Sequence, residues 1–296
     1  MGHQISRRRF LECSAAASAL AVVPLRTWGH PSDAMAGDEL DFPLVDFHAH
    51  IESDFPLERA AQVAKERGVK FGVVEHGGFH QTLASDDDLK RYMERLSGQP
   101  FYKGMQAEGL DWMECFSKEA VAQLDFVLSD ALTFPEKDGR LVRLWTSEAK
   151  VVDKQDFMDR YVDFIVRVIS QEPIDIFANP TFLPEPIVAE YDALWTKERM
   201  AKVIAAAVKH EVAIEINSRY NIPSLAFIRT AKEAGVKFSF GSNAHGEEAG
   251  RLDYCLKVAK EIGLRRQNMF VPAPADKKPI LRLTLARLGV GESHPS

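Results

Sequence analysis

The sequence predicts an α/β protein whose parallel strands close into a barrel. From about residue 40 onward, short apolar runs alternate with longer amphipathic stretches of helical period. Strands that alternate with helices are joined by crossover connections and therefore run parallel. Seven or eight such units close most economically into a barrel, and an open doubly wound sheet is the alternative. No Gly-x-Gly-x-x-Gly or Walker-type loop follows an early strand, which disfavours the nucleotide-binding form of that open sheet.

The expected elements alternate along the chain. Short apolar runs predict strands at 44–48, 70–75, 102–108, 124–129, 174–178, 212–217, 237–241 and 268–271. Apolar residues at helical spacing predict helices at 57–67, 86–96, 155–171, 197–210, 223–234, 251–263 and 279–288. Segment 131–154 interrupts this alternation with Pro135 and Asp138-Gly139, and we expect an insertion folded as a hairpin over the barrel mouth. Segment 181–195 is expected to be a long loop.

The charge balance disfavours a nucleic-acid partner. The chain of 296 residues carries 37 Lys and Arg against 43 Asp and Glu, a net charge of −6. A surface that holds DNA or RNA needs clustered Lys and Arg to neutralise the phosphates. We therefore expect a small-molecule substrate.

The N-terminus resembles a bacterial twin-arginine export signal. Arg7 and Arg8 precede a mildly apolar run at 14–23, and Ala34-Met35-Ala36 offers a small-x-small cleavage site. The apolar run is shorter than the ~20 residues that a membrane-spanning helix needs. The resemblance implies a cleaved signal peptide at 1–36, a single domain at 37–296, recognition by the twin-arginine translocation machinery, no stable membrane insertion and a periplasmic or otherwise exported protein.

The most informative motif of the mature chain is Val45-Asp46-Phe47-His48-Ala49-His50. Side chains alternate between the two faces of a strand, so His48 and His50 are expected to point the same way and to bind one metal ion. Further polar side chains follow the later strands, and in a parallel barrel these strand ends converge on one mouth. In chain order they are Glu75-His76, Glu108, Asp130, Asn179, Glu215, Asn217, Asn243 and His245. This mixture of imidazoles and carboxylates suits Zn, Mn or Fe better than Ca or Mg.

These strand ends resemble the polymerase-and-histidinol-phosphatase (PHP) family of metal-dependent phosphoesterases. The resemblance runs from about residue 43 to 272. It is carried by Asp46-Phe47-His48-Ala49-His50, Val73-Val74-Glu75-His76, Gln106-Ala107-Glu108-Gly109, Glu215-Ile216-Asn217 and Gly241-Ser242-Asn243-Ala244-His245. It implies a distorted seven-stranded, TIM-like (β/α)7 barrel of the PHP type. It also implies one to three divalent metal ions and hydrolysis of a small phosphate ester by metal-activated water.

The chain departs from the family pattern at three positions, and at one of them, after the middle strand, it has Ser129-Asp130 where the family often has His. Asn179 stands where the family usually has His, and Asn243 where it usually has Asp. An amide oxygen is a weaker ligand than either, so a site with both replacements is expected to hold fewer ions or to hold them less tightly.

The candidate residues divide into metal ligands and catalytic groups. His48, His50 and Glu108 are expected to hold one ion, His76 and His245 to complete that site or a neighbouring one, and Asn179 and Asn243 to contribute as weaker ligands. Asp130 is either a ligand or a base that orients the attacking water, and Glu215 is a further catalytic candidate. Arg219 is a candidate for binding the substrate phosphate, with a solvated loop residue as the alternative.

Two other functions remain open. Amidohydrolases also begin with His-x-His, but they commonly have a lysine ligand in mid-barrel, and Lys103 begins its strand instead of ending it. A non-phosphate metallohydrolase is thus one alternative. The other is a non-catalytic, degenerate PHP-like binding protein, which the asparagines at 179 and 243 favour.

Overall fold

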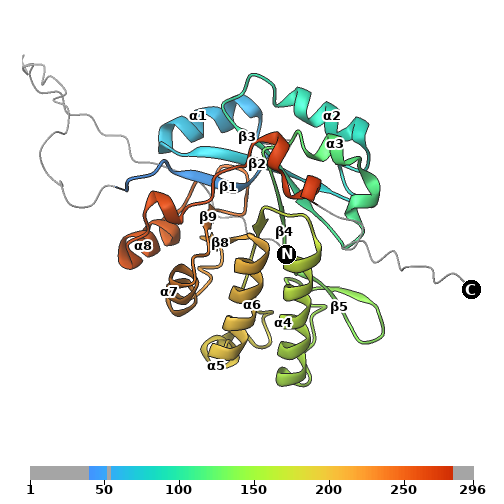
Figure 1. Ribbon diagram of the computed structural model, residues 1–296, viewed down its shortest axis with the longest axis vertical. Helices are drawn as coiled ribbons and strands as arrows, with labels where there is room; N and C mark the ends of the chain where they lie inside the picture. Colours follow the sequence, from blue (N-terminus) through green and yellow to red (C-terminus); the bar gives the residue numbers. More distant parts are fainter. Residues whose placement is uncertain (1–39, 52–54, 283–296) are drawn as a thin grey trace, which may run out of the picture. The chain divides into compact units, whose positions relative to one another are not determined.

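Seven parallel strands form a closed barrel in the computed structural model, which describes residues 40–51 and 55–282 (Figure 1). The predicted signal segment 1–36 lies outside the described residues. The strands are β1 (Val45–His50), β2 (Lys70–Gly77), β3 (Tyr102–Ala107), β4 (Phe126–Ser129), β7 (Ile176–Phe177), β8 (Ala213–Asn217) and β9 (Phe238–Gly241). They pair in that order, and β9 pairs back with β1 through Asp46 and Phe240. The predicted seven-stranded α/β barrel is therefore confirmed.

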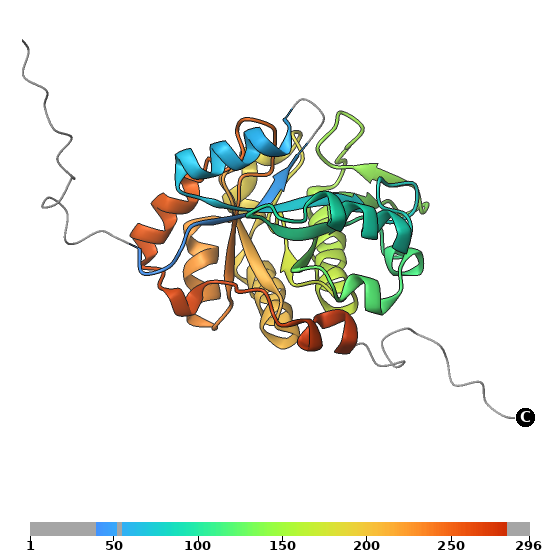
Figure 2. The same ribbon diagram turned by 90° about the horizontal axis from the view of Figure 1, so that it is seen from above.

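Helices cover the outside of the barrel (Figures 1 and 2). They are α1 (Leu57–Arg67), α2 (Asp86–Arg95), α3 (Lys118–Val121), α4 (Lys154–Gln171), α5 (Tyr191–Leu194), α6 (Lys197–His210), α7 (Leu225–Glu233) and α8 (Asp253–Ile262). Several begin where a polar side chain accepts a hydrogen bond from an otherwise unpaired amide, as Ser85, Asp153, Thr196 and Ser224 do. Among the described helices, none is long and apolar enough to cross a membrane.

The predicted strand at 268–271 is wrong. Residues Arg266–Asn268 form a 3-10 turn, and Met269 makes only an isolated bridge with Phe238. Beyond this bridge, the segment gives β9 one hydrogen bond, from the amide of Phe270 to the carbonyl oxygen of Phe238, and β9 is otherwise paired with β8 and, through Phe240, with β1. The predicted helix at 279–288 begins as a 3-10 turn over Pro279–Arg282, and its last six positions lie outside the described residues.

The inside of the barrel is filled by aromatic and branched side chains below the mouth. Phe47 packs edge-on against Phe126 at a ring-centroid distance of 5.2 Å. A Cβ atom on Gly104 would lie 2.3 Å from the Phe126 ring, so only glycine leaves room there for the phenyl group. This filled core forms a floor beneath the polar residues at the strand ends.

A bulge in β1 places one extra residue between Asp46 and Ala49 relative to β2. As a result, the consecutive residues Phe47 and His48 both face the inside of the barrel: Phe47 packs in the inner core, and His48 contacts side chains of β3 and β8. A regular strand would send one of the two outward. The bulge thus lets Phe47 join the inner core while His48 also faces inward, beneath the mouth of the barrel.

The insertion at 131–154 folds as predicted into a hairpin of β5 (Thr133–Pro135) and β6 (Leu141–Arg143). Gly139 has φ of 82° in the turn that joins the two strands. The hairpin is fixed to the barrel by Phe134, whose ring lies edge-on to Tyr161 of α4. Segment 181–195 is a loop that ends in a 3-10 turn and the short helix α5, in agreement with its prediction.

Candidate active site

A pocket of about 200 Å³ lies at the carboxyl ends of the strands. Eight of the ten residues predicted from the sequence line it: His50, His76, Glu108, Asp130, Asn179, Arg219, Asn243 and His245. Gln106, Leu132, Trp145 and Tyr220 complete the lining. The other two predicted residues, His48 and Glu215, are buried and do not line the pocket. The barrel thus brings one predicted group of residues together from strands that are far apart in the sequence.

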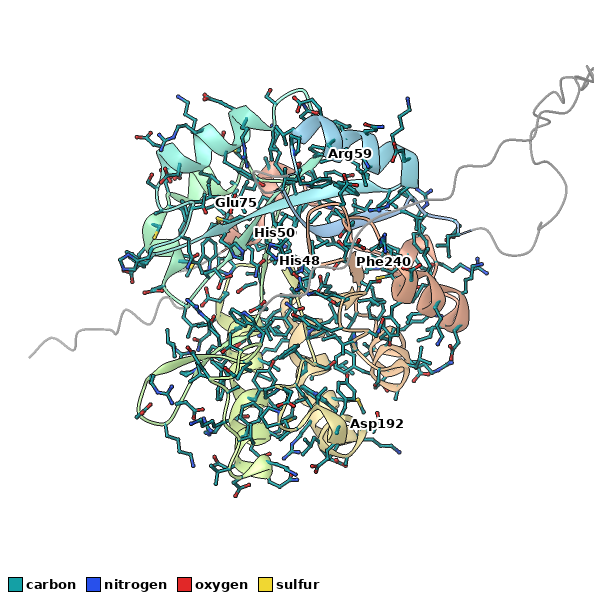
Figure 3. All side chains as sticks on the ribbon, turned by 180° about the vertical axis from the view of Figure 1, so that it is seen from behind. His48, His50, Arg59, Glu75, Asp192 and Phe240 are labelled. Atoms are coloured by element: carbon teal, nitrogen blue, oxygen red, sulfur yellow. The ribbon has the colours of Figure 1, made fainter. Side chains whose placement is uncertain are left out.

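Three imidazoles surround His50, which Figure 3 shows beside His48. Its ring stacks on His245 at a centroid distance of 4.1 Å and on His76 at 4.9 Å, and it lies 5.4 Å from His48. The short strand β10 (Ala244–His245) brings His245 there, because it pairs in parallel with Ala49 and His50. Burial, together with the three neighbouring imidazoles, holds the pKa of His50 well below its usual value. His50 is therefore neutral at pH 7.

His48 lies beneath this cluster between two acceptors. Its Nδ1 donates to Glu215 Oε1 at 2.7 Å, and its Nε2 donates to Gln106 Oε1 at 3.1 Å. Burial alone would lower the pKa of His48, but the carboxylate of Glu215 outweighs burial and raises that pKa. In the same way, the pKa of Glu215 is lowered against the effect of burial by His48 and by hydrogen bonds from Asn179 and Asn217. The structure therefore places Glu215 as the partner that orients His48.

Two carboxylates face the pocket. Glu108 Oε1 accepts a hydrogen bond from Nδ1 of His76 at 2.9 Å, and Nε2 of His76 has no hydrogen-bond partner among the described residues. Asp130 is held by Asn179, whose Nδ2 donates to its Oδ2 at 3.0 Å, and by the backbone amide of Leu132. Burial, and after it the carboxylate of Glu108, raises the pKa of Asp130 to about 6.

The two asparagines that replace the expected ligands belong to one amide network. Oδ1 of Asn179 accepts hydrogen bonds from Nδ2 of Asn217 at 3.0 Å and from Nδ2 of Asn243 at 3.3 Å. Its amide oxygen is thus already satisfied within the protein. Asn179 and Asn243 both have φ of 49°, a left-handed conformation that asparagine adopts more readily than most residues. These contacts indicate that Asn179 shapes the pocket and orients Asp130.

Arg219 is the one lysine or arginine that lines this pocket within the described residues. One of its nitrogens, Nη1, donates to the backbone oxygen of Asn243 at 2.9 Å, and its guanidinium group lies over the ring of Tyr220. These contacts fix one side of the planar group and leave its other donors available to an anion. Arg219 therefore lies where the sequence predicts a phosphate-binding residue.

Two residues of the site were missed by sequence reasoning. Asp46 is fully buried and accepts four hydrogen bonds, from the backbone amides of His48, Ser242 and Gly250 and from the Ser242 hydroxyl. It ties β1 to the segment that carries His245. Gln106 lies two positions before Glu108, on the same face of β3, and alternation along the strand was the signal that could have identified it.

The donor set suits a divalent cation, although no metal-binding geometry is formed. No group of three His, Cys, Asp or Glu residues among those described is arranged to hold an ion. Both ring nitrogens of His48 are taken by Glu215 and Gln106. Nevertheless, carboxylates orient the Nδ1 atoms of His48 and His76, as such partners orient metal-ligating imidazoles. By this chemical criterion, the residues fit a zinc-type ion.

Comparisons with known proteins connect the chain to phosphatases over part of its length. No family model matches it. Probable phosphatases of Thermoanaerobacter sp. (strain X514) and of Thermoanaerobacter pseudethanolicus are each 30% identical to it over 121 residues. The match covers 38% of this chain and 45% of each relative, so the chain spans less than half the length of the curated relatives it matches.

The fold has a counterpart among solved structures. A histidinol phosphate phosphatase from Lactococcus lactis subsp. lactis Il1403, solved with zinc, L-histidinol and phosphate, superposes with a TM-score of 0.57 at 15% identity. The match covers 79% of this chain and 98% of that protein. At this identity the likeness shows a shared barrel fold.

Proposed function

We propose that this protein is a metal-dependent phosphatase that hydrolyses small phosphate esters in the pocket at the barrel mouth. The observation that carries the proposal is the combination of neutral imidazole, carboxylates and one fixed guanidinium group around one cavity of about 200 Å³. The sequence likeness to probable phosphatases and the zinc-binding and phosphate-binding counterpart of the fold support it.

The chain's own residues have distinct tasks in this proposal. Arg219 binds the phosphoryl oxygens with the donors that Asn243 leaves available. Asp130, held by Asn179 and by the amide of Leu132, accepts a hydrogen bond from the attacking water and orients it toward the phosphorus atom. Leu132 and Trp145 line the cavity on the side of the hairpin and limit the access of bulk water.

His50, His76, Glu108 and His245 would hold the metal ion, because they line the pocket and carry nitrogen and oxygen donors. When bound, a Zn, Mn or Fe ion lowers the pKa of a water ligand and neutralises charge on the phosphoryl oxygens. His48 takes part only if Nε2 releases Gln106, so its first task is to support His50 from below.

Metal content and phosphate release test the proposal. The full chain is expected to contain at least one ion per molecule by elemental mass spectrometry, and His50→Ala/His76→Ala to contain none. His210→Ala is the matched control, because His210 ends α6 and does not line the pocket. A wild-type chain that stays metal-free after incubation with Zn, Mn and Fe would refute metal dependence.

Arg219→Ala is expected to lower kcat/KM for a phosphate ester about 10- to 100-fold, the usual worth of a hydrogen bond to a charged group. Arg229→Ala is the control, since its guanidinium group pairs with Glu261 on the surface. A metal-loaded wild type that releases no phosphate from any monoester would favour the non-catalytic barrel, for which the satisfied amide oxygen of Asn179 is the structural argument.

We also propose export through the twin-arginine pathway, on the basis of Arg7 and Arg8 and the apolar run that follows. Arg7→Lys/Arg8→Lys is expected to retain the protein in the cytoplasm of a bacterial host, whereas the unchanged chain reaches the periplasm. Cell fractionation distinguishes the two results. Equal distribution of both proteins would refute the export signal.

A further inference from the structure

A groove of about 630 Å³ adjoins the candidate active site. One wall comes from residues 79–81 and 109–114, which follow β2 and β3, and the other from the β5–β6 hairpin. His76, Glu108 and Trp145 line both the groove and the inner pocket. The two cavities therefore meet, and a ligand can occupy both at once.

The inner pocket is smaller than most cavities that hold a whole small molecule. Its volume is about 200 Å³, whereas cavities for small molecules commonly measure about 300–1,000 Å³. A phosphoryl group bound by Arg219 and the imidazoles takes up part of that space. A bulky alcohol part of a phosphate ester then extends past Trp145 into the groove.

Side chains of the groove favour a flat apolar group. Phe79, Leu141 and Trp145 are large apolar residues that remain 45%, 60% and 48% exposed, and all three line it. Trp112 and Trp195 are buried in the protein, so Trp145 is the exposed indole among the described residues. An indole face at the edge of a cavity stacks well on a planar ring.

The charges of the groove disfavour a second phosphate. Asp111 and Glu114 contribute two carboxylates to one wall, and Arg143 contributes one guanidinium group to the other. A nucleoside di- or triphosphate would therefore place its further phosphates against carboxylates. An uncharged ring meets no such repulsion.

We propose that this groove binds the leaving group of the substrate and that the substrates are monophosphate esters of aromatic alcohols, with the ring stacked on Trp145. The inference rests on the proposed phosphatase function and specifies its substrate class. The hairpin, and with it Trp145, Leu141 and Arg143, becomes the part of the chain that determines specificity.

The test compares two primary alkyl phosphates, 2-naphthylmethyl phosphate and n-propyl phosphate, in which the CH₂–O–phosphate unit carries a naphthyl ring or an ethyl group, with the full chain supplied with Zn²⁺. We expect the wild type to favour the naphthylmethyl ester at least tenfold in kcat/KM. In Trp145→Ala that preference falls about tenfold, the ordinary worth of an aromatic contact and its buried area. Trp145→Phe retains most of it. Val152→Ser is the control, because Val152 is fully exposed in the same insertion and lines neither cavity.

Binding of non-hydrolysable 2-naphthylmethylphosphonate, measured by calorimetry, separates the groove from the chemistry. Expected is a Kd about tenfold weaker in Trp145→Ala and unchanged in Val152→Ser. Hydrolysis of both esters without a preference that depends on Trp145 would overturn the groove assignment and leave the phosphatase proposal intact. If neither ester is hydrolysed, the phosphatase proposal fails. Phosphonate binding then tests the groove assignment by itself. Binding that is weakened in Trp145→Ala supports the assignment, and binding that is not weakened, or no binding, overturns it.

Discussion

Replacing Asp46 with asparagine tests whether hydrogen bonds from one buried carboxylate hold the site together. Oδ1 accepts from the amides of His48 at 3.1 Å and Ser242 at 2.9 Å. Oδ2 accepts from the Ser242 hydroxyl at 2.6 Å and from the amide of Gly250 at 2.7 Å. All four partners are donors, and an asparagine can offer them only one oxygen.

The free energy lost by Asp46→Asn follows from these contacts. In the less costly orientation, the new NH₂ group replaces Oδ2, and the Ser242 hydroxyl turns to accept from it. The Gly250 amide cannot turn, and a buried unsatisfied N–H costs about 1–3 kcal/mol. The two hydrogen bonds that Oδ1 keeps are no longer made to a charged acceptor, which weakens each by about 1 kcal/mol. We therefore expect the free energy of unfolding to fall by about 3–5 kcal/mol.

Urea unfolding followed by circular dichroism measures this loss, and Asp175→Asn is the matched control. Asp175 is also buried, at 6% exposed, but its carboxylate accepts from one backbone amide, that of Val127. Burial raises the pKa of Asp175 to about 6, which means that the folded state holds its charge at a cost, and asparagine is expected to lose less than about 1 kcal/mol. The reasoning is refuted if the two variants lose the same stability.

Two further predictions follow from close contacts and from burial. Gly241→Ala would place a Cβ 1.9 Å from Oε1 of Glu215. We therefore expect the free energy of unfolding to fall by about 3 kcal/mol or more, and phosphate release to be lost as well. Gly98→Ala is the control, because Gly98 has φ of 76° but no atom within 4 Å of an added Cβ, and we expect it to lower the free energy of unfolding by about 1 kcal/mol. Equal losses in the two variants would contradict the steric argument. Burial raises the pKa of Glu172, which accepts from Trp112 Nε1, to about 7. Because the folded state favours the protonated acid, Glu172 contributes fully to the stability of the fold below about pH 4.5, and this contribution is lost as the pH rises to about 7. Glu172→Gln should remove up to about 3 kcal/mol of this pH dependence in urea titrations at pH 5 and 8, and an unchanged dependence would count against it.

The alternation of apolar runs and amphipathic stretches was enough to predict the barrel. Each of its seven strands forms within two or three residues of its expected bounds, because buried parallel strands and their crossover helices leave strong local patterns. The strand at 268–271 failed for a non-local reason. Its residues are apolar enough for a strand, but how far they pair with β9 depends on how β9 also pairs with β1, and no local pattern records that pairing.

The candidate site was predictable in its membership and not in its contacts. Strand-end position identified His50, His76, Glu108 and His245 correctly as neighbours. It could not show that Glu215 lies behind the pocket as the partner of His48, because strand-end position does not say how deep a side chain lies, nor that Phe47 turns inward together with His48. A bulge changes which face a residue occupies, and its position is not visible in the pattern of β1. The metal ligation and the export signal remain predictions.

The bonds from Asp46 to Ser242 and Gly250 join residues that are 196 and 204 positions apart. During synthesis, the first strand therefore leaves the ribosome long before the segment that completes its surroundings. A chain interrupted after α7 would have His50 without His245 and Asp46 without most of its donors. Nearly the whole polypeptide must be made before the pocket can exist, so contacts of high sequence separation are expected to make assembly of the pocket a slow step in folding. Partly synthesised chains would therefore lack the complete pocket.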